Sequence, residues 1–208
     1  MKYDPVKSRI GTIVKRSVWL RKTFYTLLDI LLLRTWHVKR AIRLFNRMKP
    51  GANNILDAGS GFGQYTWRMC KMNKKWTILG IDIKDEQVHD CNRFINKTGA
   101  QGRVSFALAD LTEYMTAASY DLVLSVDVME HIENDRAVFR NFYHSLRNGG
   151  WLIISTPSDK GGSDVHHHDD HSFIDEHVRD GYGKEEIEEK LADAGFTDIK
   201  TSYTYGKP

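Results

Sequence analysis

The sequence predicts an α/β fold built on a doubly wound, mostly parallel sheet. Short apolar runs alternate with amphipathic runs from about residue 54 onward. The apolar runs are nearly continuous, as in strands that are buried on both faces. A glycine-rich loop separates the first apolar run from the first amphipathic one. With right-handed crossovers, the carboxyl ends of all strands, and any ligand groups on them, lie at one edge of the sheet.

Length and composition predict one domain with an appendage. The chain has 208 residues, of which 41% are hydrophobic and 27% charged, as in soluble globular proteins. Its two cysteines, Cys70 and Cys91, lie in predicted helices without metal-ligand spacing. This usage, and the lack of a secretory signal pattern, favour a reduced, cytoplasmic protein.

Charge divides the chain at about residue 50. Residues 1–50 hold 13 Lys and Arg against two Asp, whereas residues 51–208 hold 17 against 25 acidic residues. The first segment therefore has a net charge of +11 and the second −8. Such asymmetry indicates that residues 1–50 meet an anionic partner, such as an acidic substrate or an anionic membrane.

One or two helices are predicted between Ser17 and Pro50, forming a helical cap on the domain of residues 51–208. Asp29 and Arg34 interrupt the longest apolar stretch, so it is too polar to span a bilayer. Basic side chains are expected on the opposite, solvated side. The predicted apolar stripe consists of Leu20, Phe24, Leu27, Leu31, Val38, Ile42 and Phe45, and the basic side of Arg21, Lys22, Arg34, Lys39, Arg40, Arg43 and Arg47.

Strands and helices alternate through the second segment. A long stretch without periodicity, residues 157–183, contains the run His166 to His171 and is predicted to be a lid over the substrate pocket. Adventitious metal binding is the alternative for that run. The predicted strands are residues 55–58, 76–83, 103–109, 120–126, 151–155 and 197–205, and the predicted helices are residues 64–73, 84–98, 134–147 and 184–194.

The loop after the first strand reads Asp57-x-Gly59-x-Gly61-x-Gly63. Glycines allow positive φ angles and the close approach of a ligand, and the next helix then directs its first N–H groups at that ligand. A dinucleotide-binding loop would read G-x-G-x-x-G, and the third glycine of that pattern is missing in either register. A nicotinamide oxidoreductase is therefore disfavoured.

Two further acids end the next two strands. Asp82 lies 23 residues after Gly59, where a carboxylate can accept both hydroxyl protons of a ribose. Ile83 can pack on an adenine ring. Asp110 can accept from the adenine amino group, and Leu111 can offer its backbone N–H.

These features resemble the class I S-adenosylmethionine-dependent methyltransferases, whose fold is Rossmann-like. The resemblance covers roughly residues 50–200 and includes the runs 56–63, 80–82, 109–111, 120–132 and 146–150. It implies that S-adenosylmethionine is the cofactor and S-adenosylhomocysteine the product. The cofactor-binding residues that it implies are Asp57, Gly59, Ser60, Gly61, Gly63, Tyr65, Asp82, Ile83, Asp110, Leu111 and Ser125.

Candidate catalytic residues follow the fourth strand of this segment. Asp127, Glu130 and His131 lie there, and His131 suits the removal of a proton from the acceptor. The spacing is similar to that of ubiquinone- and menaquinone-pathway methyltransferases, where it can hold a divalent cation. Alternatively, Glu130 and His131 only orient the next helix. We assign no metal.

The resemblance leaves the end of the sheet and the acceptor open. The family sheet has seven strands and this sequence predicts six, so the last strand is absent or the sequence stops short of it. We expect a small-molecule acceptor, lipid-like or quinone-like, with peripheral contact of residues 1–50 to an anionic membrane. One alternative is RNA or another polyanion, which the scarcity of stacking aromatics among the basic residues disfavours. The other is a non-catalytic cofactor-binding or membrane-peripheral module.

Overall fold

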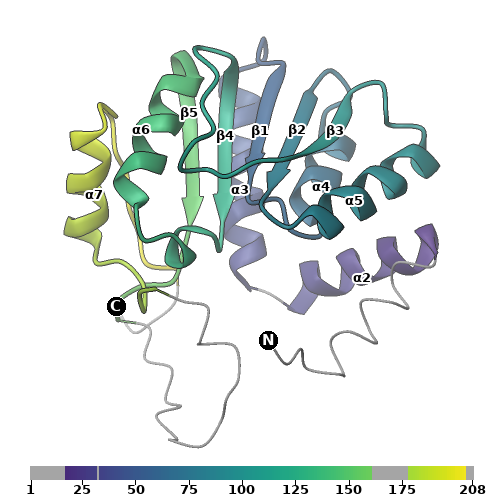
Figure 1. Cartoon of the computed structure of the whole chain (residues 1–208), viewed down its shortest axis with the longest axis horizontal. Helices are drawn as coiled ribbons and strands as arrows, with labels where there is room; N and C mark the ends of the chain where they lie inside the picture. The colour runs from purple at the N-terminus through teal and green to yellow at the C-terminus, as the bar shows by residue number, and fades with distance from the viewer. Residues whose placement is uncertain (1–16, 32, 161–177, 205–208) are drawn as a thin grey trace, which may run out of the picture.

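A five-stranded parallel sheet forms the centre of the protein (Figure 1). The computed structural model describes residues 17–31, 33–160 and 178–204. The strand order is β3-β2-β1-β4-β5, which confirms the predicted doubly wound α/β fold. Because the order reverses at β1, the crevice between the ends of β1 and β4 is where such sheets bind ligands. The strands are β1 (Asn54–Ala58), β2 (Thr77–Asp82), β3 (Val104–Leu108), β4 (Tyr120–Val126) and β5 (Leu146–Ser155).

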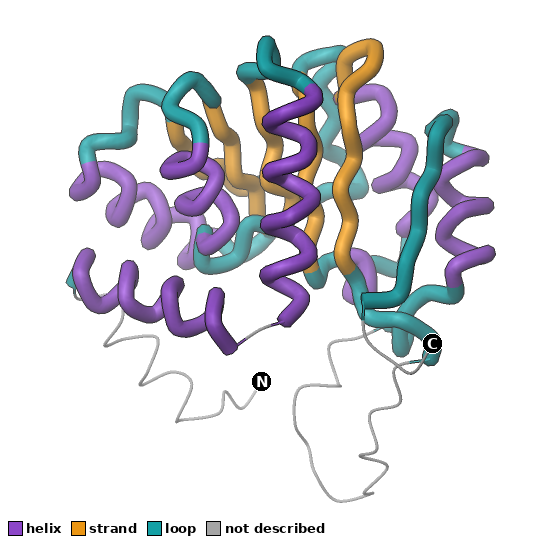
Figure 2. Tube along the Cα trace, turned by 180° about the vertical axis from the view of Figure 1, so that it is seen from behind, coloured by secondary structure: helices purple, strands orange, loops and turns teal. Residues whose placement is uncertain are grey.

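Helices cover both faces of the sheet. Helices α3, α4 and α5 lie on the face that Figure 2 presents, and α6 and α7 lie on the other face. Helix α2 crosses below the carboxyl ends of the strands (Figure 1). The helices are α2 (Val18–Leu31), α3 (Leu33–Met48), α4 (Gln64–Met72), α5 (Asp85–Thr98), the 3-10 helix η1 (Met129–His131), α6 (Asp135–Ser145) and α7 (Lys184–Asp193).

Neighbouring residues of β1 belong to two different hydrophobic cores. Ile55 packs with Phe45 of α3 and Trp76, whereas Leu56 packs with residues of α6 such as Phe139. All of these side chains are fully buried. Successive strand residues point to opposite faces, so a continuous apolar strand fills both cores at once.

The C-terminal part differs from the prediction. The strand predicted at residues 197–205 is absent as far as Thr204, the last residue described there. Asp198 has a φ of 53°, which is incompatible with an extended strand. The helix predicted at residues 134–147 also ends earlier, at Ser145, because β5 already begins at Leu146. The His-rich run, residues 166–171, lies outside the described residues.

The predicted apolar stripe is right for α3, whereas on α2 only Phe24 of the stripe packs against the core. Val38, Ile42 and Phe45 of α3 are buried, as predicted. On α2, by contrast, Leu27 and Leu31 are 50% and 64% exposed. The buried residues of α2 are polar: Arg21, Tyr25 and Asp29.

Candidate active site

The glycine loop after β1 has a conformation that requires glycine. Gly59, Gly61 and Gly63 have φ angles of 75°, 50° and 75°, in the left-handed region. A Cβ on Gly59 would lie 2.3 Å from Cγ2 of Val128, the second residue after β4. The loop and the end of β4 thus come into direct contact at the point where the strand order reverses.

Asp82 ties the end of β2 to this loop. One carboxylate oxygen accepts the Gly61 N–H at 2.8 Å, and the other accepts the Lys84 N–H at 2.9 Å. These donors fix the carboxylate at the carboxyl edge while leaving lone pairs for a further donor. The neighbouring Ile83 side chain is 65% exposed, so an apolar surface lies beside the carboxylate.

Asp57 is held beneath the loop rather than on its surface. Its side chain is 2% exposed, and it accepts a hydrogen bond from the Thr66 hydroxyl group of α4. Burial raises the pKa of Asp57 to about 6, although the Thr66 hydrogen bonds lower it. Thr66 was not predicted from the sequence as a site residue. The signal available in the sequence was a polar residue on the predicted buried side of α4.

Asp127, the residue directly after β4, has a strained backbone conformation. Its φ is 53°, and its N–H donates to the Ser155 carbonyl at 2.8 Å. Arg34 of α3 forms an ion pair with its carboxylate, with 2.7 Å between Nη1 and Oδ2. Burial raises the pKa of Asp127 to about 6, Arg34 lowers it, and the charge of Glu130 raises it. The N-terminal segment therefore supplies a residue to the carboxyl edge.

The other two catalytic candidates differ in exposure. Glu130 is 2% exposed and accepts a hydrogen bond from the Thr156 hydroxyl group at 3.1 Å. His131 is exposed, at the end of η1. Of the two neighbouring residues, Glu130 is therefore buried and His131 is at the surface. Among the described residues, no three His, Cys, Asp or Glu side chains are grouped so that they could hold a metal ion.

The remaining predicted residues divide into two groups. Ser60 and Ser125 are buried, and their hydroxyl oxygens have no hydrogen-bond partner. Tyr65 lies near Asp57 and Asp127, since the charges of both carboxylates, after burial, raise its pKa. By contrast, the Asp110 carboxylate accepts from Thr112 in a local turn, and Leu111 is buried.

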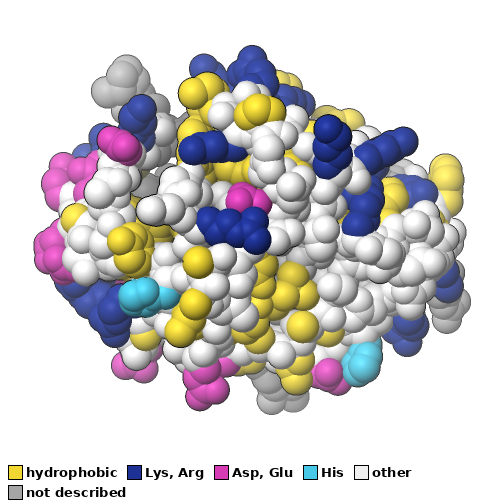
Figure 3. Space-filling model, turned by 90° about the horizontal axis from the view of Figure 1, so that it is seen from above, with side chains coloured by type: hydrophobic (Ala, Val, Ile, Leu, Met, Phe, Trp, Pro, Cys, Tyr) yellow, Lys and Arg dark blue, Asp and Glu magenta, His cyan; other side chains and the backbone are white. Residues whose placement is uncertain are grey.

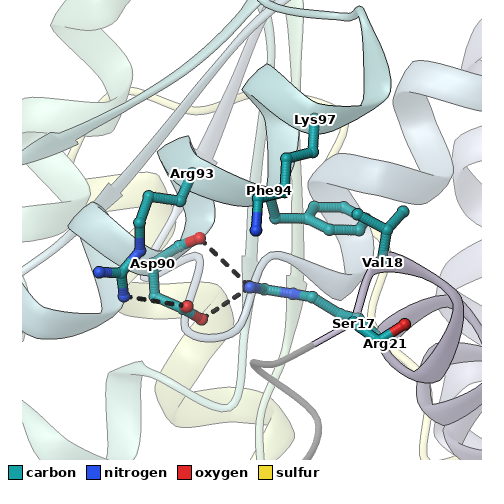
Figure 4. Close-up of a pocket in the computed structure, with 7 residues that line it drawn as sticks. All are labelled: Ser17, Val18, Arg21, Asp90, Arg93, Phe94 and Lys97. Carbon is teal, nitrogen blue, oxygen red and sulfur yellow. Dashed lines mark hydrogen bonds and ion pairs between the residues drawn. The ribbon is translucent and has the colours of Figure 1, made fainter.

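Helix α2 is fastened to the glycine loop by two buried polar side chains, of which Arg21 was predicted on the solvated side and is buried instead. The Arg21 guanidinium group donates to the Phe62 carbonyl at 2.8 Å. It also donates to the Asp90 carboxylate of α5 at 2.6 Å, as Figure 4 shows. The Tyr25 hydroxyl group donates to the same Phe62 carbonyl. Arg21, Tyr25 and Asp29 recur every four residues on one helix face, and this spacing was the signal available in the sequence.

Asp29 fastens the end of α2 to the helix that follows the loop. Its buried carboxylate pairs with Lys39 at 3.2 Å and with Arg68 of α4, and it accepts from Gln64 at 3.0 Å. Three cationic or amide donors therefore compensate one buried carboxylate, which makes its burial tolerable. The cap and the cofactor loop consequently share one polar network.

The fold and this edge define a class of protein: an α/β domain that binds a nucleoside-containing cofactor in the crevice between β1 and β4. The family described as a methyltransferase domain matches residues 50–195, and the chain belongs to this family. The cofactor of this family is S-adenosylmethionine, and the product formed from it is S-adenosylhomocysteine. Residues 50–195 therefore form an S-adenosylmethionine-dependent methyltransferase domain.

Curated relatives are similar to this chain over part of their length. Phosphoethanolamine N-methyltransferase 1 of Arabidopsis thaliana is 29% identical over 160 residues, which cover 73% of this chain and 30% of that protein. Malonyl-[acyl-carrier protein] O-methyltransferase 2 of Ilyobacter polytropus is 23% identical over 120 residues, which cover 58% and 45% of the two chains. The chain thus spans less than half the length of these relatives.

A solved structure shares the fold. Phosphoethanolamine N-methyltransferase 2 of Haemonchus contortus, in complex with phosphomonomethylethanolamine and S-adenosylhomocysteine, superimposes with a TM-score of 0.65. The sequence identity is 23%, and the match covers 78% of this chain and 38% of that one. The similarity supports the fold of the domain.

The described residues fit S-adenosylmethionine. A Cβ at Gly61 would have only Gln87 Oε1 nearby, at 3.9 Å, so the loop is open at this point. The hydroxyl groups of Ser60 and Ser125 are buried and lack partners, as expected where a polar ligand completes the site. Asp82 would hold the ribose, and Ile83 would cover the adenine.

Proposed function

We propose that this protein transfers a methyl group from S-adenosylmethionine to a small-molecule acceptor that is lipid-like or quinone-like. The observation that carries the proposal is the placement of Asp57, Asp82 and Asp127 around one glycine loop. Each carboxylate is fixed by a donor of the protein, so the edge is negatively charged before any ligand arrives. Such an edge suits a cofactor that bears an ammonium and a sulfonium group.

When bound, the cofactor supplies an activated methyl group, and the protein supplies position and a site poor in water. We assign the removal of the acceptor proton to His131, which is exposed at the end of η1. Glu130, held by Thr156, positions η1. Asp127 and Tyr65 orient the cofactor beside the acceptor.

The residues after β4 and the basic cap, residues 1–50, indicate the class of acceptor. The order Asp127, Glu130, His131 is similar to that of ubiquinone- and menaquinone-pathway methyltransferases, which favours a ring- or lipid-like acceptor. We place the protein in the cytoplasm, in peripheral contact with an anionic membrane through residues 1–50. No helix in the described parts of the chain is long and apolar enough to cross a bilayer.

Calorimetric titration with S-adenosylmethionine and S-adenosylhomocysteine tests the cofactor site. Asp82→Ala removes the carboxylate assigned to the ribose and should weaken binding by about tenfold or more, or about 1.4 kcal/mol. Asp85→Ala is the matched control, because Asp85 is an exposed acid three residues further on, paired only with His89 across the surface. Equal affinities of both variants would contradict the assignment of Asp82.

The acceptor is tested by transfer of a labelled methyl group into cell extracts. Label should enter the fraction that organic solvent extracts, and His131→Gln should reduce the rate while cofactor affinity stays unchanged. RNA is the second candidate, because Trp36, Lys39, Arg40 and Arg43 line an open groove of about 460 Å³ on α3. Label in the RNA fraction, with salt-dependent RNA binding, would favour it over the lipid-like acceptor.

A further inference from the structure

Helix α2 packs with its polar side toward the protein and its apolar side outward. Arg21, Tyr25 and Asp29 are 4%, 3% and 5% exposed. On the opposite side, Trp19, Leu27, Ile30 and Leu31 are 70%, 50%, 63% and 64% exposed. A surface helix of a soluble domain normally has the reverse arrangement. Its outward side is therefore suited to an apolar environment outside the domain.

Two further exposed apolar residues lie at the start of α3. Leu33 and Trp36 at the start of α3 are 58% and 57% exposed. Isolated exposed apolar residues are ordinary, whereas a row of them on one side of the molecule indicates an interaction site. In this row the exposed Thr23 and Thr26 lie between Trp19 and Leu27. We call this row the outer face; it consists of Trp19, Leu27, Ile30, Leu31, Leu33 and Trp36.

The outer face lies at a defined place relative to the active site. Helix α2 lies beyond the carboxyl ends of the strands (Figure 1), and its buried side contacts the glycine loop through Phe62. The outer face therefore points away from the sheet, on the same end of the molecule as Asp82 and Asp127. Whatever binds the outer face also borders the active site.

The charge of residues 1–50 indicates which kind of partner binds the outer face. The net charge of residues 1–50 is +11, against −8 for the rest of the chain. Lys22 and Arg40 are exposed near the outer face, and two tryptophans lie at its ends. Figure 3 views the molecule from the end opposite α2, and both acidic and basic side chains appear on that end. Basic residues, aromatic residues and an apolar row together are typical of helices that lie in the interface of an anionic bilayer.

We infer that the outer face docks on anionic lipid, with α2 lying in the headgroup region and the active site facing the bilayer. A second copy of the chain fits this face poorly, because a two-fold interface would bring the exposed basic residues Lys22 and Arg40 of both copies together. The inference rests on the proposed function, which places residues 1–50 against an anionic membrane, and deepens it by assigning that contact to the outer face.

Sedimentation with lipid vesicles tests the inference on the full chain. We expect binding to phosphatidylcholine vesicles that contain phosphatidylserine, weaker binding without phosphatidylserine, and a loss of binding as salt is raised. The triple variant Leu27→Gln, Ile30→Gln, Leu31→Gln should lower vesicle binding by about tenfold or more. Met48→Gln is the control, since Met48 is 62% exposed at the other end of α3.

Titration with S-adenosylmethionine distinguishes a failure of the lipid contact from a failure of the proposed methyltransferase function. The triple variant should bind the cofactor with the affinity of the wild type. This result would show that α2 still covers the glycine loop in the variant. Vesicle binding that is equal for the triple variant and Met48→Gln would overturn the lipid contact, even if the methyltransferase proposal holds. A wild-type dimer that the triple variant converts to a monomer, without vesicle binding, would overturn it in favour of a second copy.

Discussion

Arg34 of α3 lies 2.7 Å from the carboxylate of Asp127 at the end of β4. This ion pair connects the basic N-terminal segment to Asp127, the residue that follows β4 at the carboxyl edge of the sheet. Asp127 has the unusual φ of 53°, and its carboxyl pKa is raised by burial to about 6. The cap thus contributes to the electrostatics of the site as well as covering it.

Removal of this pair should change the titration of Asp127. Arg34 lowers the pKa of that carboxyl, so Arg34→Met should raise it above its present value of about 6. Carbon-13 NMR of the labelled carboxyl group measures the change directly. Arg40→Met, on the exposed side of the same helix, is the control and should leave the Asp127 pKa in place. A lower pKa in Arg34→Met would show that the ion pair does not form.

Gly59 should be intolerant of any side chain. Gly59→Ala places a Cβ 2.3 Å from Val128 at a φ of 75°, so both a clash and backbone strain arise. We expect a loss of about 2 kcal/mol or more in the free energy of unfolding, measured by urea denaturation. Gly51→Ala, where no atom lies within 4 Å, is the control. In the double variant with Val128→Ala, part of the loss should be recovered, because only the clash is relieved.

Stability should depend on pH through Asp57. Its pKa is about 6 in the folded protein against an ordinary value of 3.8, because burial disfavours the charged form. Between these values the folded state binds the extra proton, so the free energy of unfolding falls as pH rises from about 4 to about 6. Asp57→Asn removes this contribution, so its stability should decline less over that window. Denaturation curves of both proteins at several pH values measure the difference; parallel curves would contradict the raised pKa.

The buried pair of Arg21 and Asp90 should contribute strongly to the docking of α2. Both side chains are 5% exposed, and Arg21→Met leaves the buried Asp90 carboxylate with only the more distant, exposed guanidinium group of Arg93 beside it. The expected loss is about 3–5 kcal/mol in the free energy of unfolding. Arg93→Met is a matched control, because Arg93 approaches the same carboxylate at 3.4 Å but is 67% exposed. It should cost about 0.5 kcal/mol or less.

The sheet and the cofactor edge could be predicted from the sequence because they rest on local patterns. The apolar strand 120–126 agrees with β4 residue for residue, and the glycine spacing after Asp57 predicted a loop with positive φ angles. The last predicted strand, residues 197–205, failed as far as Thr204. Alternation of side chains alone does not provide a hydrogen-bonding neighbour, and a strand exists only where another strand pairs with it.

The sequence by itself determined the fold class and the family, since each follows from periodicity or from a motif of fixed spacing. Only the tertiary structure decided which side of α2 is buried. Apolar periodicity predicts that the leucines face inward, but the Phe62 carbonyl and the Asp90 carboxylate lie beneath the helix and select Arg21 and Tyr25 instead. Buried polar groups require partners, and whether a partner is present depends on residues far away in the chain.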